Sequence, residues 1–265
     1  MEWVWFLLAG GFAGICAGLF GVGGGLIIVP VLVWVFTLLG MNPAVIAHVA
    51  LGTSLATIVV TSISSLSAHH KQGGVRWDIF KTMALGLMAG SVFGAYVAGM
   101  IHSQSLQIII GAGAILMAIK MLFFPNQERT DRALPSQGVQ IGAGAGIGFL
   151  SAIVGIGGGS LTVPFLNWGG VPMKQAVGTS SACGLPIAIA GAIGFILFGQ
   201  GVDTRVAGTW GFVHIQAFIF ISVASFVTAK IGAKLAHKLP ANTLKRAFGV
   251  LLLIVGGVMV SRGMF

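Results

Sequence analysis

Charged side chains are scarce in this 265-residue chain, where they make up 7% of the residues. A typical soluble domain has about 25%. No Asp, Glu, Lys or Arg occurs from Trp3 through His70, a run far longer than the roughly 20 residues that one transmembrane helix needs. This scarcity excludes a soluble globular domain. It predicts an all-α polytopic membrane protein whose main surroundings are the lipid bilayer.

Acidic residues and cysteines are rarer still. All five acids lie at predicted span ends or in loops, so no carboxylate is expected inside a span. This argues against a proton relay built on Asp or Glu and against an intramembrane protease with paired aspartates. Cys16 and Cys183 lie in apolar segments without the spacing of a metal or redox site. We therefore expect no enzyme activity, no catalytic residue, no metal and no cofactor.

Basic residues give the chain a formal net charge of +9. In a soluble protein such a charge would suggest nucleic-acid binding. In a membrane protein, however, Lys and Arg concentrate in cytoplasmic loops, so we expect no nucleic-acid partner.

Glycine, in contrast, is abundant, and its pattern reveals an internal repeat. The stretch LFGVGGGLIIVPVLVW from Leu19 matches IVGIGGGSLTVPFLNW from Ile153 at eight of sixteen positions. The segments ALGTS from Ala50 and AVGTS from Ala176 follow in the same order. Ordered matches at nearly constant spacing indicate a duplication. We predict a first membrane repeat at 1–124, a charged, proline-containing linker at 125–137 and a second membrane repeat at 138–265.

The first apolar block of each repeat is too long for one crossing. As a straight helix, the block at 3–40 would extend about 57 Å, whereas the hydrocarbon core is about 30 Å thick. Because the Gly-rich motif lies near its middle, we predict a helix, a sharp turn and a second helix that begins near Pro30, or near Pro164 in the second repeat. Each block is either a re-entrant hairpin or two short crossings, and either way the chain returns to its starting side.

Three transmembrane helices follow the broken block in each repeat. They are expected at 45–67, 79–100 and 105–124, and at 176–199, 207–235 and 243–262. Two glycine series with a spacing of four are typical of close helix packing. They are Gly10, Gly14 and Gly18, and Gly86, Gly90 and Gly94.

The basic residues also predict an orientation. If each first block turns back, twelve of the fourteen Lys and Arg residues fall on one side and only Arg205 and Arg262 on the other. The positive-inside rule then places both termini outside and the linker in the cytoplasm. The two repeats are inverted relative to each other in this arrangement. Inverted repeats with broken helices are a common plan of secondary transporters, whose substrate site lies near the midplane at the repeat interface.

The Gly-rich turns are the predicted substrate site. Free backbone N–H groups at such a turn and at the following helix N-terminus can bind an anion. No Lys-Ser or Lys-Thr follows the glycines, which argues against a nucleotide-binding loop. The recurring Gly-Thr-Ser segments would add hydroxyl donors, although such hydroxyls also commonly bond back to their own helix.

The second repeat carries polar residues where the first is apolar. Ser160, Thr162 and Asn167 replace Leu26, Ile28 and Val33, so the site leans toward the second repeat. The candidate substrate-binding residues are Gly23, Gly24, Gly25, Thr53, Ser54, Gly157, Gly158, Gly159, Ser160, Asn167, Thr179 and Ser180.

The motifs GVGGGLIIVP and GIGGGSLTVP, each followed by a Gly-Thr-Ser segment, resemble the TauE/SafE family of sulfite exporters. The resemblance covers essentially the whole chain. It implies an integral plasma (inner) membrane protein that exports a small sulfur-containing anion, such as sulfite or an organosulfonate like sulfoacetate. Roles are carried over only to the glycines and the Gly-Thr-Ser positions that match in both halves.

Two alternatives remain open from the residues themselves. One is a gated anion channel of the same architecture, and the other is a membrane scaffold that transports nothing. Assembly as a homo-oligomer, such as a dimer, is also left open.

Overall fold

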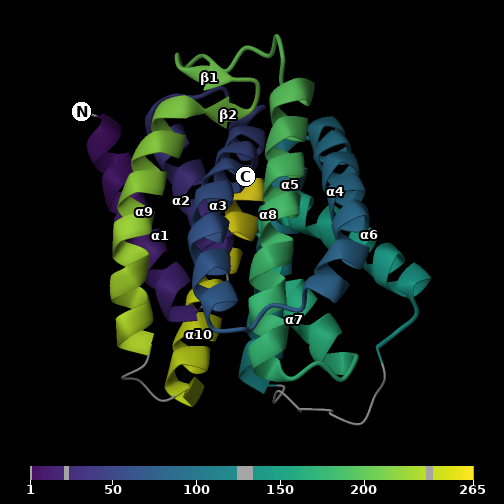
Figure 1. The fold of residues 1–265 in the computed structure, drawn as a ribbon. Helices are drawn as coiled ribbons and strands as arrows, with labels where there is room; N and C mark the ends of the chain where they lie inside the picture. The colour runs from purple at the N-terminus through teal and green to yellow at the C-terminus, as the bar shows by residue number, and fades with distance from the viewer. Residues whose placement is uncertain (1, 21–23, 124–133, 237–240, 265) are drawn as a thin grey trace.

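The computed structural model describes residues 2–20, 24–123, 134–236 and 241–264, and these form an almost entirely helical bundle (Figure 1). Six of the described helices are long and apolar enough to cross a membrane. The prediction of an all-α polytopic membrane protein is therefore confirmed. The six spans are α3 (Ile46–Lys71), α4 (Trp77–Met100), α5 (Ser103–Phe123), α6 (Gln137–Val154), α8 (Met173–Phe198) and the Arg246–Met264 part of α10 (Ala241–Met264).

The first block of each repeat is a helical hairpin. In the first repeat, α1 (Glu2–Phe20) and α2 (Gly25–Leu38) are antiparallel, because Trp5 near the start of α1 contacts Trp34 near the end of α2, with ring centroids 5.6 Å apart. In the second repeat, α7 (Gly159–Trp168) returns toward the start of α6, since Gly169 packs against Pro135. With 10 residues, α7 is about 15 Å long, half of the hydrocarbon core. Its length favours a re-entrant hairpin over two full crossings.

The second arm of each hairpin begins earlier than expected. Gly24 and Gly158 have φ angles of 72° and 73°, in the left-handed region that glycine adopts without strain, and each caps the helix that follows. The helices begin directly after them, so the prediction of a start near Pro30 or Pro164 is wrong. Each proline is the sixth residue of its helix instead, which leaves one carbonyl in the first turn without its usual helical N–H.

A short hairpin precedes α9 (Ile215–Ala236). Strands β1 (Thr209–Trp210) and β2 (Val213–His214) pair antiparallel. The expectation of a helix from residue 207 is therefore wrong for residues 207–214. Gly208 and Gly211 have φ angles of 85° and 55°, which turn the chain out of any right-handed helix.

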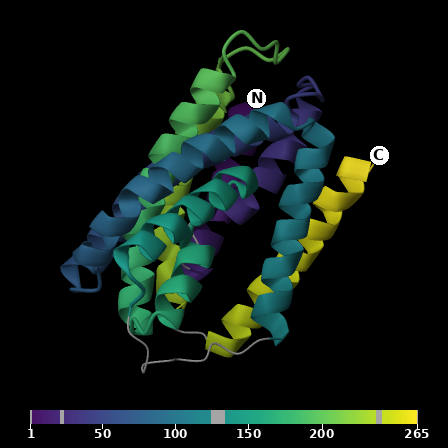
Figure 2. The same cartoon turned by 90° about the vertical axis from the view of Figure 1, so that its right-hand side faces the viewer.

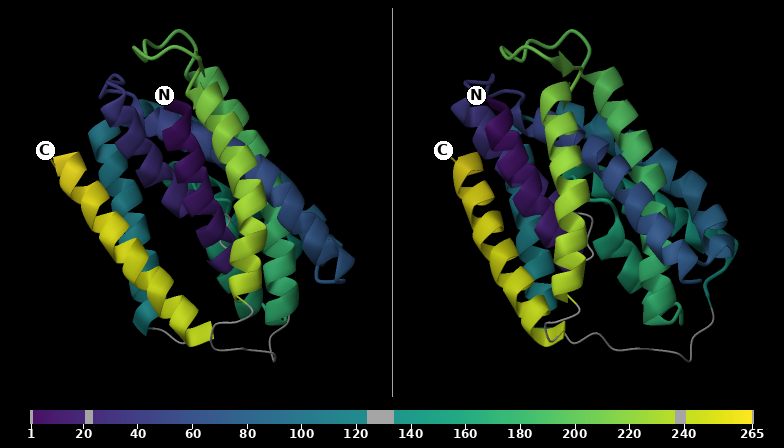
Figure 3. Two further views of the ribbon diagram at one scale, coloured as in Figure 1. Left: turned by 90° about the vertical axis from the view of Figure 1, so that its left-hand side faces the viewer. Right: turned by 60° about the vertical axis from the view of Figure 1, so that its left-hand side comes forward.

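Pairs of helices from opposite repeats build the bundle. α1 packs along α9, α4 along α6, α5 along α10, and α3 along α8 at the centre (Figures 2 and 3). A Cβ atom at Gly90 would lie 2.0 Å from the Ala145 carbonyl oxygen, so only glycine permits the approach of α4 to α6. The predicted packing role is confirmed for Gly10, Gly14, Gly86, Gly90 and Gly94. Gly18 lies outside the residues whose surroundings are described.

The two ends of the bundle are distinct. Both chain termini lie toward the end that carries β1 and β2, here called the hairpin end (Figures 1 and 3). The α3–α4 and α7–α8 turns lie at the opposite end (Figure 2). The inverted relation of the repeats and the linker boundaries stay predictions, and residues 124–133 of the linker lie outside the described residues.

Candidate functional site

The two Gly-rich breaks contact each other inside the bundle. Gly25, the first residue of α2, lies so close to Gly155 that a Cβ atom on it would be 2.2 Å from the Gly155 carbonyl oxygen. Gly155 itself ends α6 with a φ of 74°, a conformation typical of a glycine after a helix. The predicted interruption of the helices at these glycines is confirmed. The fold also brings the two interruptions into contact with each other. Gly23 lies outside the described residues.

The serines of both Gly-Thr-Ser segments bracket the second break. Ser54 on α3 donates a hydrogen bond to the Gly155 carbonyl at 3.2 Å. Ser180 on α8 donates to the Gly159 carbonyl at 3.4 Å. Both serines are buried. The central helices α3 and α8 therefore hold the end of α6 and the start of α7 from two sides.

The threonines of these segments contact other parts of the chain. The Thr53 hydroxyl accepts a hydrogen bond from the His214 N–H, and the Thr179 hydroxyl accepts one from the Arg76 N–H, each at 2.9 Å. The preceding glycines make room, because a Cβ atom at Gly178 would lie 2.2 Å from the Gly74 carbonyl oxygen. Thr53 and Thr179 thus tie the central helices to the segments that lead into α9 and α4.

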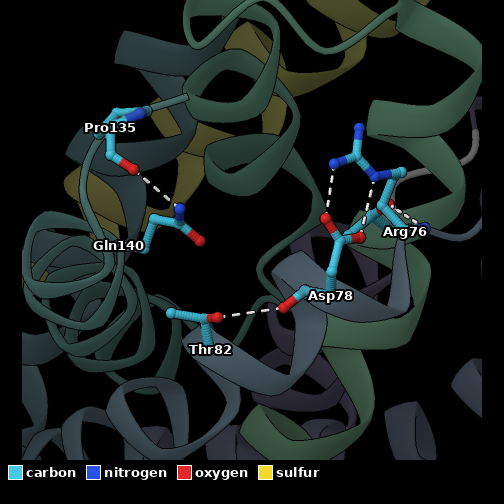
Figure 4. Close-up of polar contacts among 6 residues, drawn as sticks. Arg76, Asp78, Thr82, Pro135 and Gln140 are labelled. Atoms are coloured by element: carbon cyan, nitrogen blue, oxygen red, sulfur yellow. Dashed lines mark hydrogen bonds and ion pairs between the residues drawn. The ribbon is translucent and has the colours of Figure 1, made fainter. Parts of the chain in front are cut away.

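Arg76 has its charge paired at the surface rather than directed at the breaks. Its guanidinium forms a two-point ion pair with Asp78 in the first turn of α4 (Figure 4). On the neighbouring α6, Gln140 donates a hydrogen bond to the Pro135 carbonyl at 2.8 Å, which braces the start of that helix.

Three hydroxyl groups near the second break have no hydrogen-bond partner among the described residues. They belong to Ser151 on α6 and to Ser160 and Thr162 on α7. Ser151 and Thr162 have no exposed surface. The position that a Cβ atom would take on Gly158 is 3.5 Å from the Ser151 oxygen and 3.6 Å from the Thr162 oxygen. Both hydroxyls therefore face the same side of Gly158.

The candidate residues predicted from the sequence include neither Ser151 nor Thr162. Thr162 carried a signal, since it is polar where the first repeat has Ile28. Ser151 carried none, because a serine in an apolar helix usually bonds back to its own backbone. Asn167 lies in the last turn of α7, about 12 Å along the helix from Gly159, and is not gathered with the others.

The surroundings of the second break are uncharged. Ile58 packs against Gly157, Ile187 against Gly158, and Leu51 against Gly155. The sequence places no Lys or Arg in α1, α2, α6 or α7, while α3 and α8 carry only Lys71 and Lys174, near their ends. No cluster of metal-binding side chains occurs within the described residues.

This arrangement can bind an anion without a charged partner. The first turn of α7 points backbone N–H groups and the positive end of the helix dipole toward the break, beside the unpartnered hydroxyls.

Comparison with known proteins agrees with a transport role. The family model described as sulfite exporter TauE/SafE matches residues 6–259. A Haemophilus influenzae protein named a probable membrane transporter protein is 37% identical over 94% of each chain. The Bacillus subtilis probable membrane transporter protein YunE is 27% identical over the full length of both chains. No solved structure matches the chain.

Proposed function

The chain belongs to the sulfite exporter TauE/SafE family, and on that basis we propose that it is a secondary transporter that exports a small sulfur-containing anion. Sulfite and organosulfonates such as sulfoacetate are the proposed substrates. The membrane is the plasma membrane, and the site lies between the two Gly-rich breaks.

One observation carries this proposal: unpartnered polar groups converge on the second break. A buried hydroxyl without a partner costs about 1–3 kcal/mol, and α7 begins where two such hydroxyls face Gly158. An anion bound there would accept hydrogen bonds from these groups and from the first N–H groups of α7. Of the candidate residues, the described glycines and Ser160 are best placed for this role, since the Ser54 and Ser180 hydroxyls already donate to the carbonyls of Gly155 and Gly159.

The packing between the repeats supports alternating access. If α1 corresponds to α6, and α4 to α9, the α1–α9 and α4–α6 contacts are equivalent. The α3–α8 and α5–α10 contacts then pair equivalent helices with each other. Such a pattern is typical of two-fold related repeats that rock around a central site. Because α2, α3, α6, α7 and α8 contain no Asp or Glu, the membrane potential is the proposed driving force, worth about 2.3 kcal/mol per charge per 100 mV.

Anion flux from proteoliposomes tests the proposal. Vesicles loaded with sulfite are given an inside-negative potential, and efflux is measured for the unmodified protein, for Gly25→Ala and for Gly146→Ala. Gly25→Ala pushes a methyl group into the Gly155 carbonyl, whereas a methyl group at Gly146 meets nothing within 4 Å. We expect Gly25→Ala to lose most of the flux and Gly146→Ala to retain it.

The same experiment separates the alternatives. Efflux that saturates with sulfite concentration supports a transporter, and a far higher, non-saturating rate indicates a gated channel. No efflux of sulfite or sulfoacetate from vesicles with folded protein would overturn the transport proposal in favour of a scaffold. An efflux rate that is the same with and without the imposed membrane potential would overturn the proposed driving force.

A further inference from the structure

We propose that the substrate anion reaches the Gly-rich breaks between the central helices α3 and α8, from the end of the bundle opposite the hairpin end. Ser62 and Ser65 on α3 and Ser181 on α8 line this path with their hydroxyl groups. The inference rests on the proposed function and adds to it the route of the anion and three residues along that route.

The α3–α8 interface carries hydroxyl groups on the side of the breaks that faces the opposite end. The Ser65 hydroxyl donates a hydrogen bond to the Ser181 hydroxyl at 3.1 Å. Next to this pair, a Cβ atom on Gly184 would lie 3.1 Å from the Ser62 hydroxyl oxygen and 2.8 Å from the Gly157 carbonyl oxygen. The hydroxyl half of the interface, formed by Ser62, Ser65 and Ser181, therefore begins directly beside the second break.

Two helical turns nearer the hairpin end, the same interface is apolar. Leu55 lies seven residues before Ser62 on α3, and Gly191 lies seven residues after Gly184 on α8. A Cβ atom on Gly191 would lie 2.8 Å from Leu55 Cδ1, so a leucine takes the place that Ser62 has in the hydroxyl half. Beyond Ser181, α8 contains no Ser or Thr.

Large side chains close this apolar half. Leu55 and Phe195 have no exposed surface. A Cβ atom on Gly52 would lie 3.0 Å from Phe195 Cβ, so α3 and α8 are in direct contact there. Ser91 of α4 also lies near Gly191, but its hydroxyl already donates to the Ile187 carbonyl at 2.8 Å.

Polarity decides which half can take up water when the two helices separate. Hydroxyls that lose each other as partners can bond to water instead, so the net change is small. Separating apolar side chains exposes hydrocarbon to water, and a narrow apolar passage excludes water. Thr61 and Ser67 bond back to their own helix, as is common, whereas Ser65 bonds across to α8. The hydroxyl half is thus the side on which a hydrated anion can pass.

Two exposed lysines lie where the hydroxyl half meets the surface. Lys71 is the last residue of α3, and Lys174 lies in the first turn of α8. Gly74 lies between these two helix ends, because a Cβ atom on it would be 3.4 Å from the His69 carbonyl oxygen and 3.6 Å from the Lys174 carbonyl oxygen. Positive charge at the mouth of a passage raises the local concentration of anions. At the hairpin end, neither the start of α3 nor the end of α8 carries a Lys or Arg.

Alkylation of single cysteines tests the path. Ser65→Cys, Ser181→Cys and, as the matched control, Ala188→Cys are each made in a Cys16→Ala/Cys183→Ala background. Ala188 is fully buried and follows Ser181 by seven residues, so it lies on nearly the same face of α8 but within the apolar half. Each purified protein is treated in detergent solution, where both ends are accessible, with iodoacetate. This small anion forms a thioether that sulfite does not cleave. Sulfite efflux is then measured after reconstitution.

We expect iodoacetate to label Ser65→Cys and Ser181→Cys at least about tenfold faster than Ala188→Cys, because labelling follows the opening of each half to water. Labelling of either serine variant should abolish sulfite efflux. Since alkylation follows folding, a variant that is active before labelling and inactive after it has not misfolded. If one of the serine variants is inactive before labelling, Ser62→Cys takes its place.

Equal labelling rates in the two halves would overturn the inference, as would normal efflux from the alkylated serine variants. Absence of labelling at both serine positions would overturn it too, even while the unlabelled proteins export sulfite and so uphold the proposed function. Absence of sulfite efflux from the unmodified protein would overturn the proposed function instead, and the labelling contrast would still report which half opens to water.

Discussion

At the scale of single residues, the buried hydroxyls of Ser151 and Thr162 oppose folding unless a ligand is bound. Each is fully buried and has no partner in the described part of the chain. We expect Ser151→Ala and Thr162→Val each to raise the free energy of unfolding of the ligand-free protein by about 1 kcal/mol, because an unsatisfied polar group is removed. Thermal unfolding in anion-free detergent solution measures this. Destabilisation by either change would mean that the hydroxyl has a structural partner.

The sequence predicts some of these residues and misses others for a physical reason. The glycines at 24, 25, 155 and 157–159 stand out because four glycines in an apolar run cannot form an ordinary helix. Ser151 does not stand out, because its position beside α7 depends on the left-handed Gly155, which turns the chain so that α7 begins beside α6. Such proximity is tertiary and leaves no local pattern.

The Gly-Thr-Ser segments hold helices to the loops that precede α9 and α4, and the hydrogen-bond partners of the two copies differ in burial. His214, whose N–H donates to Thr53, is fully buried, whereas Arg76, whose N–H donates to Thr179, is partly exposed. When the hydroxyl is removed, water can reach the Arg76 N–H more readily than the His214 N–H. Thr53→Val should therefore cost about 1–3 kcal/mol of stability and Thr179→Val less.

Chemical or thermal unfolding of the two valine variants gives the comparison, with Thr53→Ser as a control that keeps the hydroxyl. Equal losses for Thr53→Val and Thr179→Val would contradict the difference in burial as its cause. A loss for Thr53→Ser as large as for Thr53→Val would indicate that the methyl group matters more than the hydrogen bond.

Hydropathy predicts the long helices well, because their length and apolarity are set by the bilayer. It fails at their ends. The starts of α2 and α7 are set by left-handed glycines rather than by Pro30 and Pro164, and the block at 207 opens with β1 and β2 because Gly208 and Gly211 reverse the chain. These details depend on single φ angles, which composition does not encode.

Across the whole molecule, the two ends close differently. At the hairpin end, Phe212 is buried and its ring stacks on His48 with centroids 5.0 Å apart, while Phe6 and Phe36 pack against His214. The segment Gly211-Phe212-Val213 of the second repeat corresponds to Gly73-Gly74-Val75 of the first. The counterpart of Phe212 at the opposite end is therefore Gly74, which has no side chain to fill the same space. The aromatic packing indicates that the hairpin end is closed. An exporter without bound substrate is expected to be closed on its outer side and open to the cytoplasm.

The orientation that this argument requires can be measured with single cysteines. Gln72 at the opposite end and Gln200 at the hairpin end are both exposed, so Gln72→Cys and Gln200→Cys form a matched pair. They are placed in a background in which Cys16 and Cys183 are alanine. We expect a membrane-impermeant maleimide to label Gln200→Cys in intact cells and Gln72→Cys only after lysis, because the basic residues gather at the Gln72 end. The reverse labelling pattern would show the opposite orientation in the membrane, with the closed hairpin end in the cytoplasm. That orientation would favour an importer over an exporter. Labelling of both in intact cells would contradict a bundle whose two ends lie on opposite sides of the membrane.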